Sequence, residues 1–160
     1  MAVSFSANII TKEMYDVEIP IVLDESWNRY QYESFARGYH AYMTIWTPFI
    51  GESLLCKHEP DNIVDKNAVA IIRTDSMGKN SVIGHLPENI SKLCTLFLKV
   101  PNTRIRARVT GKRLNRGGGY GLEVPVVYDF VGPVKFVDWV KGKLQTCKND
   151  LDNKTNKCLK

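Results

Sequence analysis

The stretch from Glu59 to Glu88 constrains the fold of this chain more than any other. It opens with a polar run, PDNIVDKN, passes into the apolar segment AVAII, and returns through a turn around Gly78 to a second short apolar segment. A short apolar run bounded by turn residues is typical of a buried β-strand. The stretch therefore predicts two adjacent strands preceded by a polar turn. Turns held on a rigid scaffold often carry binding residues.

Further strands are predicted on both sides of this stretch. Aromatic and β-branched residues favour strands before it, and strict alternation of arginines with Ile105, Ala107 and Val109 predicts a half-buried strand after it. The predicted strands cover residues 39–47, 52–58, 67–73, 82–85, 103–110 and 122–131. Many short strands with tight turns indicate a mainly β fold, a modified OB-like small barrel with one or two helices.

Two helices accompany these strands. Pro87 is suited to the first turn of a helix, which should end before Pro101. Its apolar residues recur at spacings of three and four and form a buried stripe: Ile90, Leu93, Cys94, Phe97 and Leu98. The expected organisation is a lead-in segment at 1–36 that packs on the domain, a domain at 37–132, a C-terminal helix at 133–147 and a disordered tail at 148–160.

The formal charge of +5 is unevenly distributed. Between Lys99 and Arg116 there are basic residues and no acidic ones: Lys99, Arg104, Arg106, Arg108, Lys112, Arg113 and Arg116. A local basic field favours phosphate groups. The alternative interpretation is a solvated strand face without a ligand.

Several classes of protein are disfavoured by what the sequence lacks. The four cysteines are widely spaced, without the close pairs of a structural zinc site. Neither a signal peptide nor an apolar run long enough to span a membrane is present, which favours a nuclear or cytoplasmic location without membrane contact. No phosphate loop or dinucleotide fingerprint occurs, so we expect neither cofactor nor enzymatic activity without a partner. A metal-dependent hydrolase built on Asp61, Asp65 and His85 is a weaker alternative.

The run PDNIVDKNAV followed by VIGHL resembles the HIRAN domain over about Gly38 to Gly132. The resemblance implies a modified OB fold that binds the 3′ end of single-stranded DNA. It also implies that Asp65 accepts the terminal 3′-hydroxyl, while Asn62 and His85 contribute polar contacts to the DNA end. A carboxylate accepts a hydrogen bond from a hydroxyl but repels a phosphate.

The sequence departs from the family at three positions: Val64 and Leu122 stand where stacking aromatic residues are expected, and Glu88 where a lysine is expected. Other aromatic residues are candidates to replace the lost stacking. The full set of candidate nucleic-acid-binding residues is Asn62, Asp65, Lys66, His85, Tyr39, His40, Tyr42, Tyr120, Arg104, Arg106 and Arg108. Two alternatives stay open. Asp65 is a turn residue that bonds its own backbone, or the chain is a protein-interaction adaptor that has lost DNA binding, because the aliphatic Val64 and Leu122 favour protein contacts.

Overall fold

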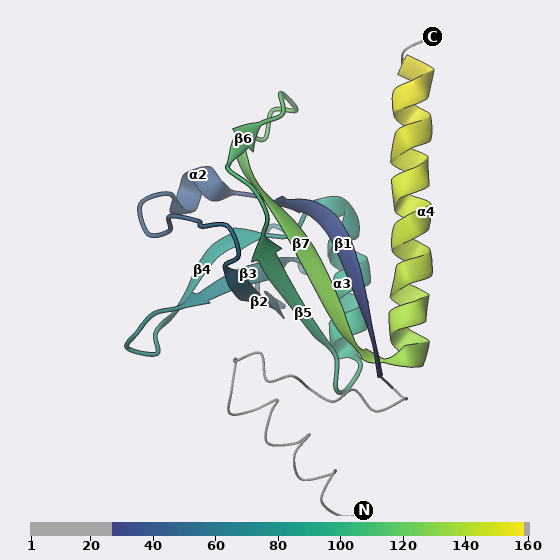
Figure 1. The fold of residues 1–160 in the computed structure, drawn as a ribbon, viewed down its shortest axis with the longest axis horizontal. Helices are drawn as coiled ribbons and strands as arrows, with labels where there is room; N and C mark the ends of the chain where they lie inside the picture. Colours follow the sequence, from purple (N-terminus) through teal and green to yellow (C-terminus); the bar gives the residue numbers. More distant parts are fainter. Residues whose placement is uncertain (1–26, 159–160) are drawn as a thin grey trace, which may run out of the picture.

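A computed structural model describes residues 27–158 of this chain. Its strands are β1 (Trp27–Ala36), β2 (Ser53–His58), β3 (Val69–Thr74), β4 (Asn80–His85), β5 (Arg104–Val109), β6 (Leu114–Asn115) and β7 (Leu122–Pro133). Its helices are α2 (Tyr39–Tyr42), α3 (Glu88–Lys99) and α4 (Val134–Cys158). The strands form one antiparallel path in the order β1-β7-β5-β2-β3-β4, and the short β6 pairs with β7 (Figure 1).

The two ends of this path meet at a single residue pair. Directly after β1, Arg37 forms an isolated bridge with His85, the last residue of β4. Each backbone amide donates to the other residue's carbonyl, at 2.8 and 3.0 Å. The sheet therefore curls back on itself as a partly open small barrel, and the expected OB-like, mainly β fold is confirmed.

The core fills the inside of this curled sheet. Ile105, Ala107 and Val109 of β5 are fully buried, as their alternation with arginines predicted. Helix α3 buries its predicted apolar stripe, and the Phe97 ring lies edge-on to Phe130 of β7 with ring centres 5.4 Å apart. Aromatic pairs prefer this arrangement.

The segment before the predicted domain includes an integral strand. β1 pairs with β7 along its whole length, from Trp27 opposite Pro133 to Ala36 opposite Val124. β7 has 12 residues and pairs with β5 on one side. β1 supplies the hydrogen-bond partners that the backbone of β7 requires on its other side. The domain therefore extends to Trp27 at least, and the expected lead-in residues 1–26 lie outside the described residues.

The predicted strand over 39–47 is wrong. A left-handed Gly38, with φ of 81°, ends the extended run after β1 and leads into the short helix α2. Tyr39 and Trp46 are both buried, with their rings edge-on at 5.9 Å. These aromatic residues pack together at one end of the core and do not alternate across a sheet.

Helix α4 begins one residue after the predicted start and continues to Cys158, through much of the segment expected to be a disordered tail. Val137, Val140 and Leu144 are fully buried at spacings of three and four. After Gly142 the sequence contains neither glycine nor proline, the residues that end helices. Figure 1 shows α4 beside β1 and α3, with its C-terminal half extending past the sheet.

Within residues 27–158, no helix has the length and apolar character required to cross a lipid bilayer.

Candidate nucleic-acid interface

The connection between β2 and β3 is a turn ordered by its own side chains. The Asn62 Oδ1 atom accepts hydrogen bonds from the backbone amides of Val64 and Asp65, both at 3.0 Å. Asp65 Oδ1 accepts one from the Asn67 amide at 2.8 Å, and the Asp65 carbonyl accepts one from Ala68. Asn and Asp commonly fold a turn in this way. One carboxylate oxygen of Asp65 is thus engaged in holding the turn.

The second carboxylate oxygen of Asp65, Oδ2, is not engaged in holding the turn. Oδ2 has no hydrogen-bond partner among residues 27–158, and the side chain is partly exposed. The carboxylate is therefore fixed in direction by one oxygen while the other is open to a donor. The turn interpretation of Asp65 is correct for Oδ1 and leaves Oδ2 for a ligand.

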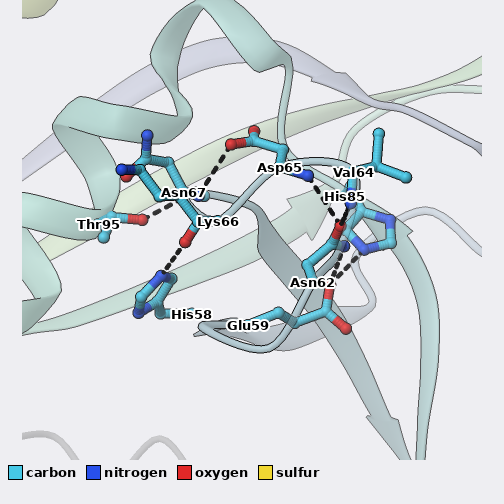
Figure 2. Close-up of polar contacts among 9 residues, drawn as sticks. All are labelled: His58, Glu59, Asn62, Val64, Asp65, Lys66, Asn67, His85 and Thr95. Carbon is cyan, nitrogen blue, oxygen red and sulfur yellow. Dashed lines mark hydrogen bonds and ion pairs between the residues drawn. The ribbon is translucent and has the colours of Figure 1, made fainter.

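Glu59 is one of the residues of this site that sequence reasoning missed. Its Oε1 atom accepts hydrogen bonds from His85 Nε2, at 2.6 Å, and from Asn62 Nδ2, at 3.3 Å. Because a carboxylate only accepts, Nε2 of His85 carries the proton. Figure 2 shows Glu59, Asn62 and His85 on one side of the turn. The two polar residues that the HIRAN resemblance singled out therefore share one carboxylate.

Aromatic residues from α2 border His85. The Tyr42 ring lies 6.2 Å from the His85 ring, and burial, followed by the charge of Glu59, raises the pKa of the Tyr42 phenol. His40 is exposed on the same helix. Tyr39 is only 2% exposed, and its hydroxyl accepts a hydrogen bond from Arg113 at 2.7 Å. Tyr39 is a core residue, and its expected contact with nucleic acid is wrong because no base can reach its ring.

Tyr120 contacts Arg37, the backbone partner of His85. Its ring is 51% exposed and covers the guanidinium of Arg37 at 3.6 Å. Residues directly opposite in an antiparallel pair point to the same face, and Arg37 is the backbone partner of His85. The flat surface made by Arg37 and Tyr120 is thus anchored beside His85. Sequence reasoning named Tyr120 and missed Arg37.

A buried acid fixes Arg37 in this position. Glu123 is 1% exposed, and Arg37 Nε lies 2.9 Å from Glu123 Oε2 as an ion pair without hydrogen-bond alignment. Arg116 donates to both oxygens of the same carboxylate, at 3.0 and 3.1 Å, and its guanidinium covers the Phe35 ring at 3.5 Å. Two arginines therefore flank one carboxylate, which leaves this corner of the molecule with a positive charge.

The three arginines of β5 do not act as one exposed basic face. Arg106 is 7% exposed and donates to the hydroxyl and carbonyl oxygens of Ser53, at 2.9 and 3.2 Å. Opposite it in register, Asp129 is held by Arg29. The expectation that Arg106 contacts phosphate is therefore wrong, since its guanidinium is enclosed between strands. Arg104 is half-buried, and Arg108 is exposed.

The exposed Arg108 is also distant from the Asp65 turn. It pairs with Ser53 at the start of β2, whereas the turn follows His58 at the end of that strand. At about 3.3 Å per residue, the two ends of β2 are roughly 17 Å apart. Lys66 is exposed within the turn itself, and its carbonyl accepts a hydrogen bond from His58 Nε2 at 2.7 Å. The structure therefore places Asn62, Asp65 and Lys66 in one turn and links Asn62 to His85 through Glu59. Tyr42 lies against His85, Tyr120 contacts the Arg37 partner of His85, and Arg108 stands apart.

The curled sheet that closes at Arg37 and His85 is similar in fold to solved HIRAN domains. The crystal structure of the HIRAN domain of human HLTF superposes with a TM-score of 0.57 and 17% sequence identity, covering 78% of this chain and 94% of that one. An NMR structure of the HLTF HIRAN domain in its DNA-bound conformation has a TM-score of 0.47 and 17% sequence identity, covering 72% of this chain and 86% of that one. No known family model and no curated protein sequence matches the chain. At this identity the comparison confirms the HIRAN-like fold.

Proposed function

We propose that this protein is a non-enzymatic nucleic-acid-binding module that recognises the 3′ end of single-stranded DNA. The observation that carries the proposal is the geometry of Asp65: Oδ1 is held by the Asn67 amide, and Oδ2 has no partner among residues 27–158. A carboxylate fixed in this way accepts a hydrogen bond from a terminal hydroxyl without first giving up another bond.

The same carboxylate discriminates against other ends. A terminal phosphate brings a negative charge to within about 4 Å of Asp65, which costs about 1 kcal/mol in water and about 4 kcal/mol near a protein surface. An internal phosphodiester offers no free hydroxyl to Oδ2. Asp65 therefore favours a free 3′-hydroxyl over a 3′-phosphate by about fivefold at the lower of these energies and by roughly several hundredfold at the higher, since 1.4 kcal/mol corresponds to a factor of ten.

Stacking in this site comes from residues other than Val64. Val64 is 92% exposed and has no flat ring to offer a base. The exposed Tyr120 covers Arg37, the backbone partner of His85, and the partly exposed Tyr42 ring lies 6.2 Å from the His85 ring. Base stacking on an aromatic side chain contributes about 1–3 kcal/mol per base. In this proposal Tyr120 and Tyr42 hold the terminal bases while Asp65 reads the hydroxyl.

The test compares two oligonucleotides that differ only at the end. Fluorescence anisotropy with a short labelled oligothymidine should give tighter binding for the 3′-hydroxyl than for the 3′-phosphate form. Asp65→Asn keeps an oxygen to accept from the Asn67 amide and removes the charge, so it should abolish the difference while the fold persists. Equal affinity of the unaltered protein for both ends would rule out end recognition.

A second candidate function is a protein-interaction adaptor without DNA binding. It is favoured by the loop after α2, in which large apolar side chains are exposed: Met43, Ile45, Phe49 and Ile50. Clustered exposed apolar residues often mark protein contacts. This function predicts no binding of either oligonucleotide at low salt and a specific protein partner recovered in a pull-down that Phe49→Ser weakens.

A further inference from the structure

A second feature of the Asp65 turn is a surface hollow of about 480 Å³ on the side facing α3. Lys66 and Asn67 of the turn form one wall, and Lys92, Thr95 and Lys99 of α3 form the other. Figure 2 shows Lys66 and Asn67 here with His58 and Thr95, on the opposite side of the turn from Glu59 and His85. The volume suits a ligand of nucleotide size.

Hydrogen bonds to the backbone fix both walls. Thr95 Oγ1 donates to the Asn67 carbonyl at 2.8 Å, which ties α3 to the turn. His58 Nε2 donates to the Lys66 carbonyl at 2.7 Å, which ties the turn to the end of β2. Lys92, Thr95 and Lys99 recur at spacings of three and four and so lie on one face of the helix. The hollow is therefore preformed, and a ligand need not order it.

The charge around the hollow is uncompensated. Three lysines and His58 line it, and its lining contains no acidic side chain. Lys66, Lys92 and Lys99 are exposed, and none forms an ion pair with another residue of 27–158. Unpaired cations around a concave surface concentrate positive potential within it. Neither the HIRAN resemblance nor the charge run at 99–116 pointed to Lys92 in this role.

We infer that this hollow binds the phosphodiester backbone of the strand whose 3′ end lies at Asp65. The inference rests on the proposed function. The two features share one wall, because Asp65 and Lys66 are consecutive and their Cα atoms are about 3.8 Å apart. A strand that presents its hydroxyl to Asp65 therefore has its preceding phosphates beside the turn. Asp65 in the turn accepts the hydrogen bond of the 3′-hydroxyl, and the lysines of the hollow bind the phosphates that precede this end of the strand.

The experiment removes two charges from the hollow and compares the result with two charges removed elsewhere. Lys92→Gln/Lys99→Gln is measured against Lys79→Gln/Lys143→Gln, whose lysines are equally exposed on the β3–β4 hairpin and on α4. The logarithm of the affinity falls as the logarithm of the salt concentration rises, and each lost phosphate contact makes this slope less steep by about 0.7 for single strands. The hollow variant should lose up to about 1.4 of that slope, and the control should keep it.

The hollow variant should weaken the 3′-hydroxyl and 3′-phosphate oligonucleotides by the same factor, so that the preference set by Asp65 persists. Oligothymidine should also shift the amide resonances of Lys66, Asn67 and Thr95. An unchanged salt slope, together with a preserved end preference, would overturn the hollow and leave the proposed function standing. Loss of the end preference in the unaltered protein would overturn the proposed function. A titration with inorganic pyrophosphate then decides the hollow alone, since absence of shifts there would overturn it as an anion site.

Discussion

Glu59 determines how accessible the polar side of the site is. Its Oε1 atom accepts from both His85 and Asn62, so a DNA end that takes a hydrogen bond from either residue must compete with this carboxylate. Its carboxylate also adds a negative charge on the His85 side of the turn, opposite the lysine hollow (Figure 2). In the proposed function, Glu59 therefore opposes the binding of DNA while it orients Asn62 and His85.

Replacing Glu59 by glutamine should strengthen binding. Glu59→Gln keeps an amide oxygen to accept from His85 Nε2 and removes one negative charge. A unit charge at about 4 Å in water contributes about 1 kcal/mol, so the affinity for a 3′-hydroxyl oligonucleotide should rise about fivefold. Fluorescence anisotropy at low salt measures it, with Glu33→Gln, exposed on β1, as the control of equal charge. Weaker binding by Glu59→Gln would show that its charge supports the site.

At the scale of single residues, the sequence predicted the local part of the site. Asn62 and Asp65 fold a turn within a few positions, and such short-range patterns are visible in a sequence. Glu59 pairs with His85, which lies 26 positions later in the sequence. Arg106 donates a hydrogen bond to Ser53, which lies 53 positions earlier. No local pattern encodes such contacts, because they depend on which strands become neighbours.

Helix α4 is attached to the domain through its first half. Val137, Val140 and Leu144 are fully buried, whereas Lys143, Gln145 and Lys148 are exposed. The contacts of the helix are with β1, α3 and β7.

Two changes in α4 should therefore differ in their effect on stability. Leu144→Ala removes a fully buried side chain and should lower the free energy of unfolding by about 2–4 kcal/mol. Deleting residues 149–160 leaves all three buried residues and should change it by less than about 1 kcal/mol. Urea denaturation followed by circular dichroism measures both. A large loss on deletion would mean that the second half of the helix also packs on the domain.

At the scale of elements, the spacing of apolar residues correctly predicted the strand β5 and the helix α3. Each of these elements buries one face, and the buried face requires apolar residues at a regular spacing. That spacing is alternate positions in β5 and three or four positions in α3. The segment at 39–47 has the composition of a strand, but Gly38 in a left-handed conformation and the packing of Tyr39 on Trp46 override it. β1 was missed because β7, its strand neighbour among residues 27–158, follows about 100 residues later in the sequence.

The whole molecule encloses two cysteines in its core. Cys56 of β2 and Cys94 of α3 are both buried, and burial raises the pKa of each thiol. A raised pKa leaves almost no thiolate at neutral or mildly alkaline pH, and the thiolate is the reactive form. Cys147 is partly exposed on α4.

Thiol modification should therefore report on unfolding of the whole domain. In a Cys158→Ser background, dithionitrobenzoate should modify Cys147 quickly and the two core cysteines only at the rate of global unfolding. Raising the pH from 7 to 9 should leave Cys56 and Cys94 protected, because burial raises the pKa of both thiols. Urea should release both core thiols together. Fast modification of Cys94 in native buffer would show that α3 opens independently of the sheet.

The pairing of β1 with β7 has a consequence for synthesis of the chain. Arg29 and Asp129, which meet in this ladder, are 100 residues apart in sequence. At a synthesis rate of about 5–20 residues per second, β1 waits about 5–20 s for its partner strand to be made. The β2–β4 meander can form during that interval, but the barrel cannot close. Arg37 can reach His85 before β7 exists, so this one bridge is suited to retain the first strand near its final place until the ribosome delivers the last.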